Sequence, residues 1–240
     1  MKLGIMQPYF FPNMAHFALI SSVDHWVVFD ITQYTPKSWI TRNRVLHPES
    51  GWNYFSLCLE RSSTTLKISD VMVKSLSDNE KMLLGKLSHY KKSAPYYRQV
   101  ICLVKKVFEL TKSNLLVDLN INSLAVICQY LSIEFKYDIC SKLAISYPEK
   151  MLPGQWAPYI SQKLRAQEYV NPIGGEHLFM VDEFTQRNIT LSFAKFTSYC
   201  YQVYGYDFVD GLSILDVMMW NSPEKIREVL LTHIHIRQAF

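Results

Sequence analysis

The sequence predicts an α/β fold: a mostly parallel, Rossmann-like sheet flanked by helices, with a helix-rich C-terminal portion. Three observations near the start of the chain carry this prediction. An apolar run at residues 2–6, a segment of helical periodicity at residues 14–22 and a second apolar run at residues 26–29 follow one another closely. Strand, helix and strand in so short a segment form a βαβ unit, whose two strands are parallel.

Local sequence signals bound each element of this unit. The first strand ends at Gln7, because the proline that follows cannot continue a strand ladder. Asn13 is a suitable N-cap for the helix. The second strand, at residues 26–29, is closed by Asp30.

The rest of the chain is predicted to alternate helices with short strands. Residues 32–48 are polar and aromatic with little periodicity, which indicates an extended loop, and residues 171–175 indicate a tight turn. Strands are expected at residues 54–59, 66–73, 135–139 and 190–193. Helices are expected at residues 78–93, 96–109, 114–131, 160–168 and 222–231.

Residues 151–156 are the best candidate for a domain boundary or a mobile loop. They contain Pro153 and Gly154, which break both the helical and the strand periodicity. The boundary would divide an N-terminal α/β lobe at residues 1–150, which carries the main site, from a C-terminal lobe at residues 151–240 packed against it. One continuous domain is the alternative.

Composition excludes several classes of protein. A chain of 240 residues with 49% hydrophobic content can bury a large core, so disorder is not expected. The net charge of +4 is spread along the chain, which argues against nucleic-acid binding but suits an anionic small substrate. The five cysteines form no CxxC pair, and no apolar run approaches the roughly 18 residues that span a bilayer. We therefore expect a cytoplasmic protein with no transmembrane segment and no metal site.

Aromatic and polar side chains follow the first strand where a site is expected. Gln7, Tyr9 and Pro12 lie in this loop, and open α/β sheets bind ligands beyond the carboxyl ends of their strands. His16, near the start of the helix, is placed to face an anion, as in the His-rich loop of nucleotidyl transferases and adenylate-forming amide synthetases. The alternative is an aromatic plug over the sheet, with His16 in the core or on the helix surface.

A second polar loop follows the second strand. Its candidate residues are Asp30, Gln33, Tyr34, Trp39, Arg42 and Asn43. Arginine offers a planar fork to carboxylate or phosphate, amides bind hydroxyls, and an aromatic face stacks on a sugar or base. We expect Gln7 and Arg42 to face one shared cavity. The alternative is a solvated loop in which Asp30 pairs with Arg42.

Further candidates lie later in the chain. Tyr90 is placed either in a pocket or, at its helical spacing, in the core. Asn171, Gly174 and Gly175 form a turn whose backbone amides can approach an anion, since glycine permits close contact. The chain lacks the glycine pattern of a phosphate loop and the motifs of serine hydrolases and zincins.

Several motifs together resemble the WbqC-like family. They are Met6-Gln7-Pro8-Tyr9-Phe10-Phe11-Pro12, Asp30 with Gln33-Tyr34, Trp39-Ile40-Thr41-Arg42-Asn43, Tyr90 with Ala94-Pro95-Tyr96, Tyr169-Val170-Asn171-Pro172-Ile173-Gly174-Gly175 and Leu212-Ser213-Ile214-Leu215-Asp216. The resemblance covers nearly the whole chain. The family pattern has Gly-Tyr-Phe where this chain has Ala15-His16-Phe17. The resemblance therefore supports seven other residues more than His16: Gln7, Tyr9, Asp30, Gln33, Trp39, Arg42 and Asn43.

The resemblance implies a role in bacterial surface-polysaccharide synthesis, because members of the family are found with O-antigen and lipopolysaccharide genes. The first hypothesis is a transferase or amide-forming enzyme that modifies a nucleotide-linked amino sugar. In it Arg42 holds an anionic group and Asp30 or His16 moves the proton. A metal-independent glycosyltransferase and a non-catalytic sugar-binding or scaffold subunit are the alternatives. No cofactor is assigned; a nucleotide, an activated acyl donor and a homodimer are left open.

Overall fold

The computed structural model describes residues 1–239 and contains the βαβ unit that the sequence predicts. It consists of β1 (Lys2–Met6), α1 (Met14–Ile20) and β2 (His25–Val28). The two strands pair in parallel, with Gly4 opposite Trp26. Asn13 precedes the helix in extended conformation, but its side chain makes no capping hydrogen bond.

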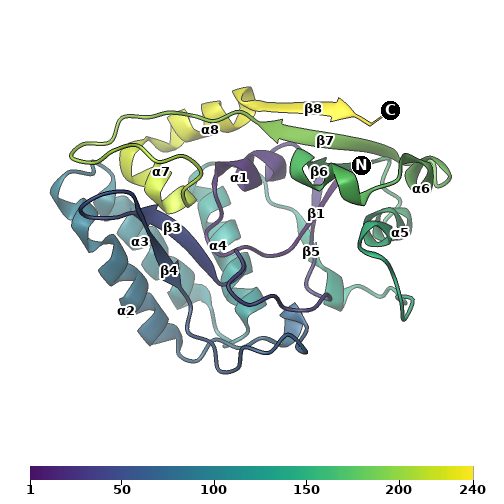
Figure 1. Cartoon of the computed structure of the whole chain (residues 1–240), viewed down its shortest axis with the longest axis horizontal. Coiled ribbons are helices and arrows are strands. Elements are labelled where there is room, and N and C mark those ends of the chain that lie inside the picture. Colours follow the sequence, from purple (N-terminus) through teal and green to yellow (C-terminus); the bar gives the residue numbers. More distant parts are fainter. Residues whose placement is uncertain (240) are drawn as a thin grey trace.

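The sheet is six-stranded and mostly parallel (Figure 1). Its remaining strands are β5 (Tyr137–Ile139), β6 (Glu168–Pro172), β7 (Thr190–Phe196) and β8 (Ile234–Gln238). The order is β5-β2-β1-β6-β7-β8, and only β8 runs antiparallel to its neighbour. The predicted α/β class is confirmed. Because β1 pairs with β6, one sheet joins both sides of residue 150, and the division into two lobes stays a prediction.

The strand order reverses between β1 and β6. From β1 the chain adds β2 and β5 on one side, and then returns to add β6, β7 and β8 on the other. The connections leaving β1 and β6 therefore run in opposite directions. At such a reversal a crevice opens beyond the carboxyl ends of the two strands, and open α/β sheets bind their ligands there.

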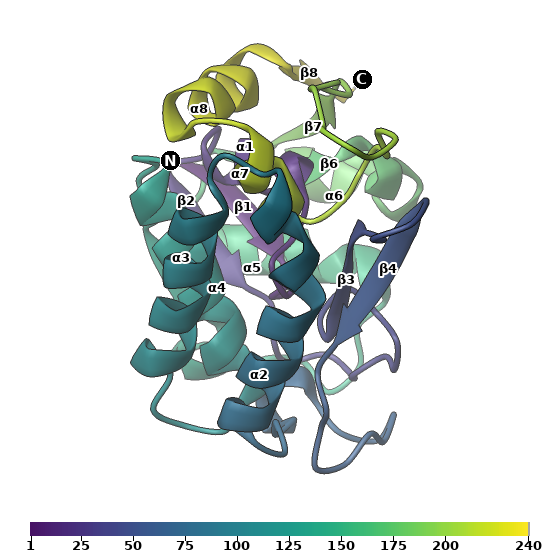
Figure 2. The same cartoon turned by 90° about the vertical axis from the view of Figure 1, so that its left-hand side faces the viewer.

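Helices cover both faces of the sheet. The α-helices are α2 (Leu76–Leu87), α3 (Tyr97–Leu110), α4 (Leu116–Tyr130), α5 (Trp156–Lys163), α6 (Val181–Thr185), α7 (Ile214–Trp220) and α8 (Pro223–Thr232). The 3₁₀ turns are η1 (Ile68–Asp70), η2 (Ser88–Lys92), η3 (Cys140–Lys142), η4 (Pro153–Gln155) and η5 (Ile173–Leu178). Helices α2, α3 and α4 pack next to one another on one side, and α5 and α6 lie on the other (Figures 1 and 2).

Alternating side chains divide the core into two clusters, one on each face of the sheet. In β2, Trp26 and Val28 belong to the larger cluster with α1, α4 and α7, while Val27 belongs to the smaller one with α5 and α6. In β6, Val170 and Tyr169 divide in the same way. Strands buried on both faces read as continuous apolar runs, which is why the sequence identified β1 and β2.

A two-stranded hairpin replaces part of the predicted loop at residues 32–48. It consists of β3 (Arg42–Leu46) and β4 (Trp52–Ser56), which pair antiparallel and lie beside α2 (Figure 2). The loop prediction was wrong over residues 42–46. Its first three residues, Arg42, Asn43 and Arg44, are all polar, so the segment shows no apolar alternation, and its pairing with β4 makes it a strand.

Other boundaries also differ from the prediction. Residues 66–73 form η1 and isolated bridges instead of a strand. The helix expected at residues 160–168 begins and ends earlier, at α5, because residues 168–172 form β6. The turn expected at residues 171–175 is the end of β6 and the start of η5. Helix α7 was missed because it is buried on every side and shows no amphipathic period.

The loop after β1 is fixed by side-chain amides and a hydroxyl. Asn120 of α4 donates its Nδ2 hydrogens to the carbonyls of Pro8, at 2.7 Å, and Ile40, at 2.8 Å. Asn43 of β3 donates to the Phe11 carbonyl at 2.8 Å, and Ser213 donates to the same carbonyl at 2.7 Å. Buried carbonyls need such partners, so this loop is held in one conformation.

We expect Asn120→Ala to lower the free energy of unfolding by about 2–4 kcal/mol, because two buried carbonyls lose their donor. Asn122→Ala on the same helix is the matched control. It removes a single hydrogen bond, to Thr111, and should cost about 0.5–1.5 kcal/mol. Urea unfolding measures both. Equal losses for the two variants would contradict the clamping role of Asn120.

Candidate functional site

A cavity of about 370 Å³ lies at the carboxyl edge of the sheet, between α1 and the hairpin. We call it the α1 cavity. Its lining residues are Met6, Tyr9, Pro12, Asn13, Ala15, His16, Leu19, Trp39, Asn43, Arg44, Pro172, Ala194, Phe196, Gly211 and Ile234. They come from the two strand ends at the reversal of strand order and from segments far apart in the sequence.

A second cavity, of about 510 Å³, lies beside it and is called the α5 cavity. Its lining residues are Ile5, Met6, Gln7, Tyr9, Phe29, Thr32, Met151, Pro153, Trp156, Ala157, Tyr169, Asn171, Pro172, Gly174, Gly175, Leu178 and Phe179. Met6, Tyr9 and Pro172 line both cavities. Since Met6 ends β1 and Pro172 ends β6, the two cavities meet at the reversal of strand order.

A third cavity, of about 260 Å³, adjoins the α1 cavity. The two share Asn13, Ala15, Phe196 and Gly211. The remaining lining residues of the third cavity are Met14, Ser198, Tyr199, Tyr201, Val209, Asp210, Leu212 and Val217. The α1 cavity is therefore the middle one of three.

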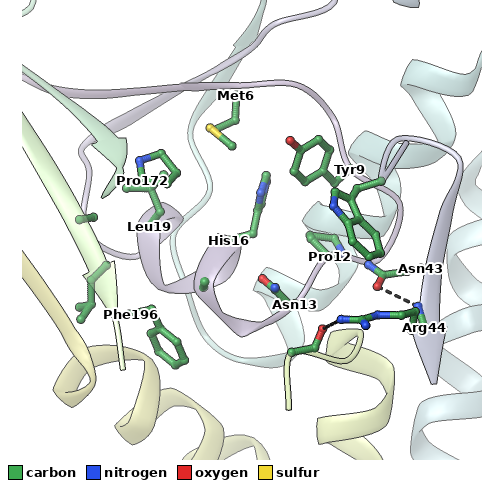
Figure 3. A pocket seen from close by; sticks show the side chains of 15 residues that line it. Met6, Tyr9, Pro12, Asn13, His16, Leu19, Asn43, Arg44, Pro172 and Phe196 are labelled. Atoms are coloured by element: carbon green, nitrogen blue, oxygen red, sulfur yellow. Dashed lines mark hydrogen bonds between the residues drawn. The ribbon is translucent and has the colours of Figure 1, made fainter. Parts of the chain in front are cut away.

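Arg44 is the cation of the α1 cavity (Figure 3). Its guanidinium carbon lies 5.4 Å from the ring centroid of Trp39 and 4.9 Å from that of Trp52. One terminal nitrogen donates to the Gly211 carbonyl at 3.2 Å. The two indoles and the Gly211 carbonyl hold the guanidinium in place, and the other terminal nitrogen is available to bind an anionic group.

His16 lies in the centre of the α1 cavity, near Tyr9 (Figure 3). Its ring centroid is 5.3 Å from that of Tyr9 and 5.1 Å from that of Trp26. The Nε2 atom is buried and has no hydrogen-bond partner within residues 1–239. Burial lowers the pKa of His16 from 6.5 to about 3. The imidazole is therefore neutral at neutral pH: one ring nitrogen can donate a hydrogen bond and the other can accept one, but the ring does not take up a second proton.

Tyr9 lies where the α1 and α5 cavities meet. Burial raises the pKa of its phenol above the ordinary value of 10.0, so the hydroxyl stays protonated. A protonated hydroxyl at this junction can donate a hydrogen bond to a ligand that occupies either cavity.

Polar groups stand at the rim of the largely apolar α5 cavity. Gln7 donates from Nε2 to the Thr32 hydroxyl at 3.2 Å. Asn171 accepts from the Tyr169 hydroxyl at 2.8 Å and donates to the Pro172 carbonyl at 2.8 Å. A Cβ at residue 175 would lie 2.4 Å from the Asn171 amide nitrogen, so a side chain there would push the Asn171 amide away from its hydrogen bonds to Tyr169 and Pro172.

The structure brings most of the predicted site residues to these cavities. Tyr9, Pro12, His16, Trp39 and Asn43 line the α1 cavity. Gln7, Tyr9, Asn171, Gly174 and Gly175 line the α5 cavity. Their roles in binding stay a prediction.

Asp30 and Arg42, two of the predicted catalytic residues, line none of the three cavities. Asp30 is buried and accepts from the backbone N–H of Ser141 at 2.9 Å and from its hydroxyl at 2.6 Å. Burial raises the pKa of Asp30, and the Ser141 hydrogen bonds oppose that shift. The guanidinium of Arg42 stacks on the Tyr54 ring at 4.1 Å. Gln7 and Arg42 thus do not meet in any of the three cavities.

Gln33 lines a further cavity of about 720 Å³, which adjoins the α5 cavity at Thr32, Met151 and Trp156. Tyr34 and Tyr90 line none of these cavities. Gln33 forms an isolated bridge with Lys67. Tyr34 is buried, with its hydroxyl 3.5 Å from that of Thr41. Tyr90 is a core residue, as the alternative interpretation held.

The Tyr90 hydroxyl accepts from the Leu46 amide at 2.8 Å and donates to the buried Asp216 carboxylate. Burial raises the pKa of both side chains. This contact joins the hairpin to α7.

Sequence reasoning missed Arg44, the cation of the site. Arg42 and Arg44 are two residues apart in β3, so their side chains lie on the same face of the strand. The signal was present: Arg44 has tryptophans on both sides in the sequence, at residues 39 and 52. The loop predicted at residues 32–48 hides this signal, because side-chain alternation identifies a common face only in a strand.

Membrane-spanning helices and metal-binding clusters are both absent from residues 1–239. No helix in this part of the chain has the length and apolarity to cross a membrane. No group of three or more His, Cys, Asp or Glu side chains there could hold a metal ion.

Comparison with known proteins identifies the family. A model of the WbqC-like protein family matches residues 7–228. The chain belongs to this family. It is also 25% identical over 224 residues to an uncharacterized protein of Mycobacterium tuberculosis, Rv1507c, with 90% of this chain and 92% of that protein covered. No solved structure matches the chain. Nearly all the lining residues of the α1 and α5 cavities fall within the part that matches the family.

We expect His16→Phe to reduce the loss of stability on acidification. Burial holds the folded-state pKa of His16 at about 3, below the unfolded value of 6.5, so only the unfolded chain binds this proton between those values. The histidine thus costs the folded state about 2 kcal/mol between pH 7 and pH 5. Urea unfolding at the two pH values measures the difference. The exposed His177→Phe should leave the pH dependence unchanged, and an equal effect of the two variants would refute the assignment.

Proposed function

We propose that this WbqC-like protein is an enzyme that transfers an acyl group to the amino group of a nucleotide-linked sugar. The observation that carries the proposal is Arg44, which presents a stacked guanidinium to a cavity at the reversal of strand order. Guanidinium groups bind phosphates through paired hydrogen bonds. In the proposal, the α1 cavity holds the diphosphate and the sugar.

The arrangement of the cavities supports a reaction of two substrates. The third cavity adjoins the α1 cavity at Asn13 and Gly211, so a second molecule can approach a sugar bound beside His16. That second molecule would be an activated acyl donor. Holding two reactants in adjoining cavities converts a bimolecular encounter into an oriented, effectively unimolecular step.

The proposed reaction needs no side chain that acts as a general acid or general base. The lone pair of the sugar amine attacks the acyl carbonyl, the new C–N bond forms and the bond to the leaving group breaks. The proton lost by the nitrogen goes to the leaving group or to solvent. Neutral His16 and protonated Tyr9 would orient the amine and the carbonyl by hydrogen bonds. A role as proton carrier falls outside this proposal, since the pKa of His16 is about 3.

A second candidate is a sugar-binding subunit that performs no chemistry. The observation that favours it is electrostatic: the pKa values of both His16 and Tyr9 are shifted away from neutrality by burial. Ring stacking on Trp39 and the cation of Arg44 would then serve binding alone. A metal-independent glycosyltransferase would use the same cavities with a sugar acceptor in the third one.

We expect Arg44→Lys to weaken the binding of nucleotide sugars about tenfold, since lysine keeps the charge but loses the paired, planar hydrogen bonds. Isothermal titration calorimetry with UDP-, GDP- and dTDP-linked amino sugars measures the dissociation constants. Arg42→Lys is the matched control, because Arg42 lies on the same strand but stacks on Tyr54 outside the cavities. Equal weakening by both variants, or by neither, would remove the support that Arg44 gives to the proposal.

We expect mass spectrometry to detect an acylated nucleotide sugar after incubation of the protein with a nucleotide-linked amino sugar and acyl-coenzyme A or acyl-adenylate donors. Tyr9→Phe should lower the rate about tenfold with little change in sugar binding, because one oriented hydrogen bond is lost. Binding without any product, across all donors, would favour the sugar-binding subunit. Transfer of the sugar itself to an acceptor would favour the glycosyltransferase.

A further inference from the structure

We infer that the α5 cavity binds the nucleobase of the ligand. This inference rests on the proposed function, because the base and the phosphate would belong to one nucleotide-linked molecule. The α5 cavity measures about 510 Å³ and shares Met6, Tyr9 and Pro172 with the α1 cavity. A ligand that spans this junction can therefore place its flat ring in the α5 cavity and its phosphates in the α1 cavity.

The walls of the α5 cavity suit a flat ring. Phe29, directly after β2, and Trp156, at the start of α5, pack edge to face against each other, with ring centroids 5.7 Å apart and an interplanar angle of 61°, and together line one wall of the cavity. Both rings are only half-buried, so part of each faces the cavity. Tyr169 and Phe179 add a second aromatic pair, 5.6 Å apart. Aromatic side chains of this kind stack on bases of any sequence.

Gln7 supplies the polar edge that a base requires. Its hydrogen bond to Thr32 uses one of the two amide N–H groups. The other N–H and the Oε1 atom are left for a ligand. An adjacent donor and acceptor on one carboxamide match the donor and acceptor that stand side by side on the edges of nucleobases.

A plain acyl chain fits the same cavity less well. It would lie against Phe29 and Trp156, but it would cover the Gln7 amide without bonding to it. Burying an amide that has lost water and found no partner is costly. The polar group at the wall of an otherwise apolar cavity therefore favours a ring with hydrogen-bonding edges.

Nearby glycines allow the backbone to close around the ring. At Gly154, a Cβ atom would lie 2.0 Å from the Leu178 carbonyl oxygen, so the loop before α5 touches the end of η5 only because glycine stands there. This contact joins the Pro153 side of the cavity to the Leu178 side. The segment at residues 151–156, predicted as a boundary or mobile loop, thereby forms a wall of the cavity.

Saturation-transfer NMR with uridine, thymidine, adenosine and guanosine tests the inference. These probes lack phosphate, so they report on the base site without Arg44. We expect the strongest saturation on base protons and a preference for one base. Gln7→Leu should weaken the binding of that nucleoside about fivefold to tenfold, as expected for lost hydrogen bonds. Gln99→Leu, a matched change at an exposed position of α3 that lines none of the cavities, should have no effect. Trp156→Leu should weaken the binding of all four nucleosides by the same factor, because stacking does not depend on the identity of the base.

The outcomes separate this inference from the proposed function. If no nucleoside binds while nucleotide sugars still bind in an Arg44-dependent way, the base site is wrong and the proposed function stands. If nucleosides bind equally to the wild type and to Gln7→Leu, or if hexanoate displaces them as well as a second nucleoside does, the assignment of a base is overturned. If nucleosides bind through Gln7 but Arg44→Lys has no effect on nucleotide sugars, the base site stands and the proposed function loses its main support.

Discussion

The hydrogen bonds to the buried carbonyls of the loop after β1 are the constraint on which the candidate site depends. This loop leaves the sheet at the reversal of strand order and carries Gln7, Tyr9 and Pro12. Its carbonyls have no strand to pair with, and each that is buried would cost free energy without a donor. Asn120 of α4 donates to the Pro8 carbonyl. Asn43 of the hairpin and Ser213 at the start of α7 donate to the Phe11 carbonyl. A loop fixed in this way can hold side chains at a cavity as firmly as a strand does.

The hairpin couples this constraint to the α1 cavity. Successive side chains of a strand point to opposite faces, so Asn43 bonds the loop while Arg44, its neighbour in β3, reaches Gly211 on the other side. The Arg44 carbonyl in turn accepts from the Ser213 amide at 2.9 Å, and Ser213 also bonds the loop. Three segments thus share one network, and a change that shifts the loop also shifts the guanidinium of Arg44.

Local patterns predicted the part of the fold in which neighbours in sequence are neighbours in space. The βαβ unit was read correctly, and Gln7 and Tyr9 line the cavities. Asp30 and Tyr90 show where such reading ends. Their partners, Ser141 and Asp216, lie 111 and 126 residues away, and nothing local distinguishes a carboxylate or hydroxyl that is satisfied in the core from one that faces a ligand. Arg44 was missed because its role follows from the pairing of β3 with β4, which is also non-local.

Burial determines what kind of chemistry the α1 cavity can perform. It moves the pKa of His16 down to about 3 and that of Tyr9 upward, so neither side chain changes its protonation near neutral pH. The same apolar packing that produces these shifts, with Tyr9 and Trp26 around the imidazole, also fixes the orientation of both groups. In the proposed reaction, such a cavity would act by positioning the two substrates. Effective molarities for well-oriented groups reach about 10⁵–10⁸ M, which is enough to accelerate an amine that is already a nucleophile. Acyl transfer to a sugar amine suits such a cavity, because the sugar supplies the nucleophile and the donor supplies the leaving group. The proposed reaction therefore requires no side chain that titrates near neutral pH.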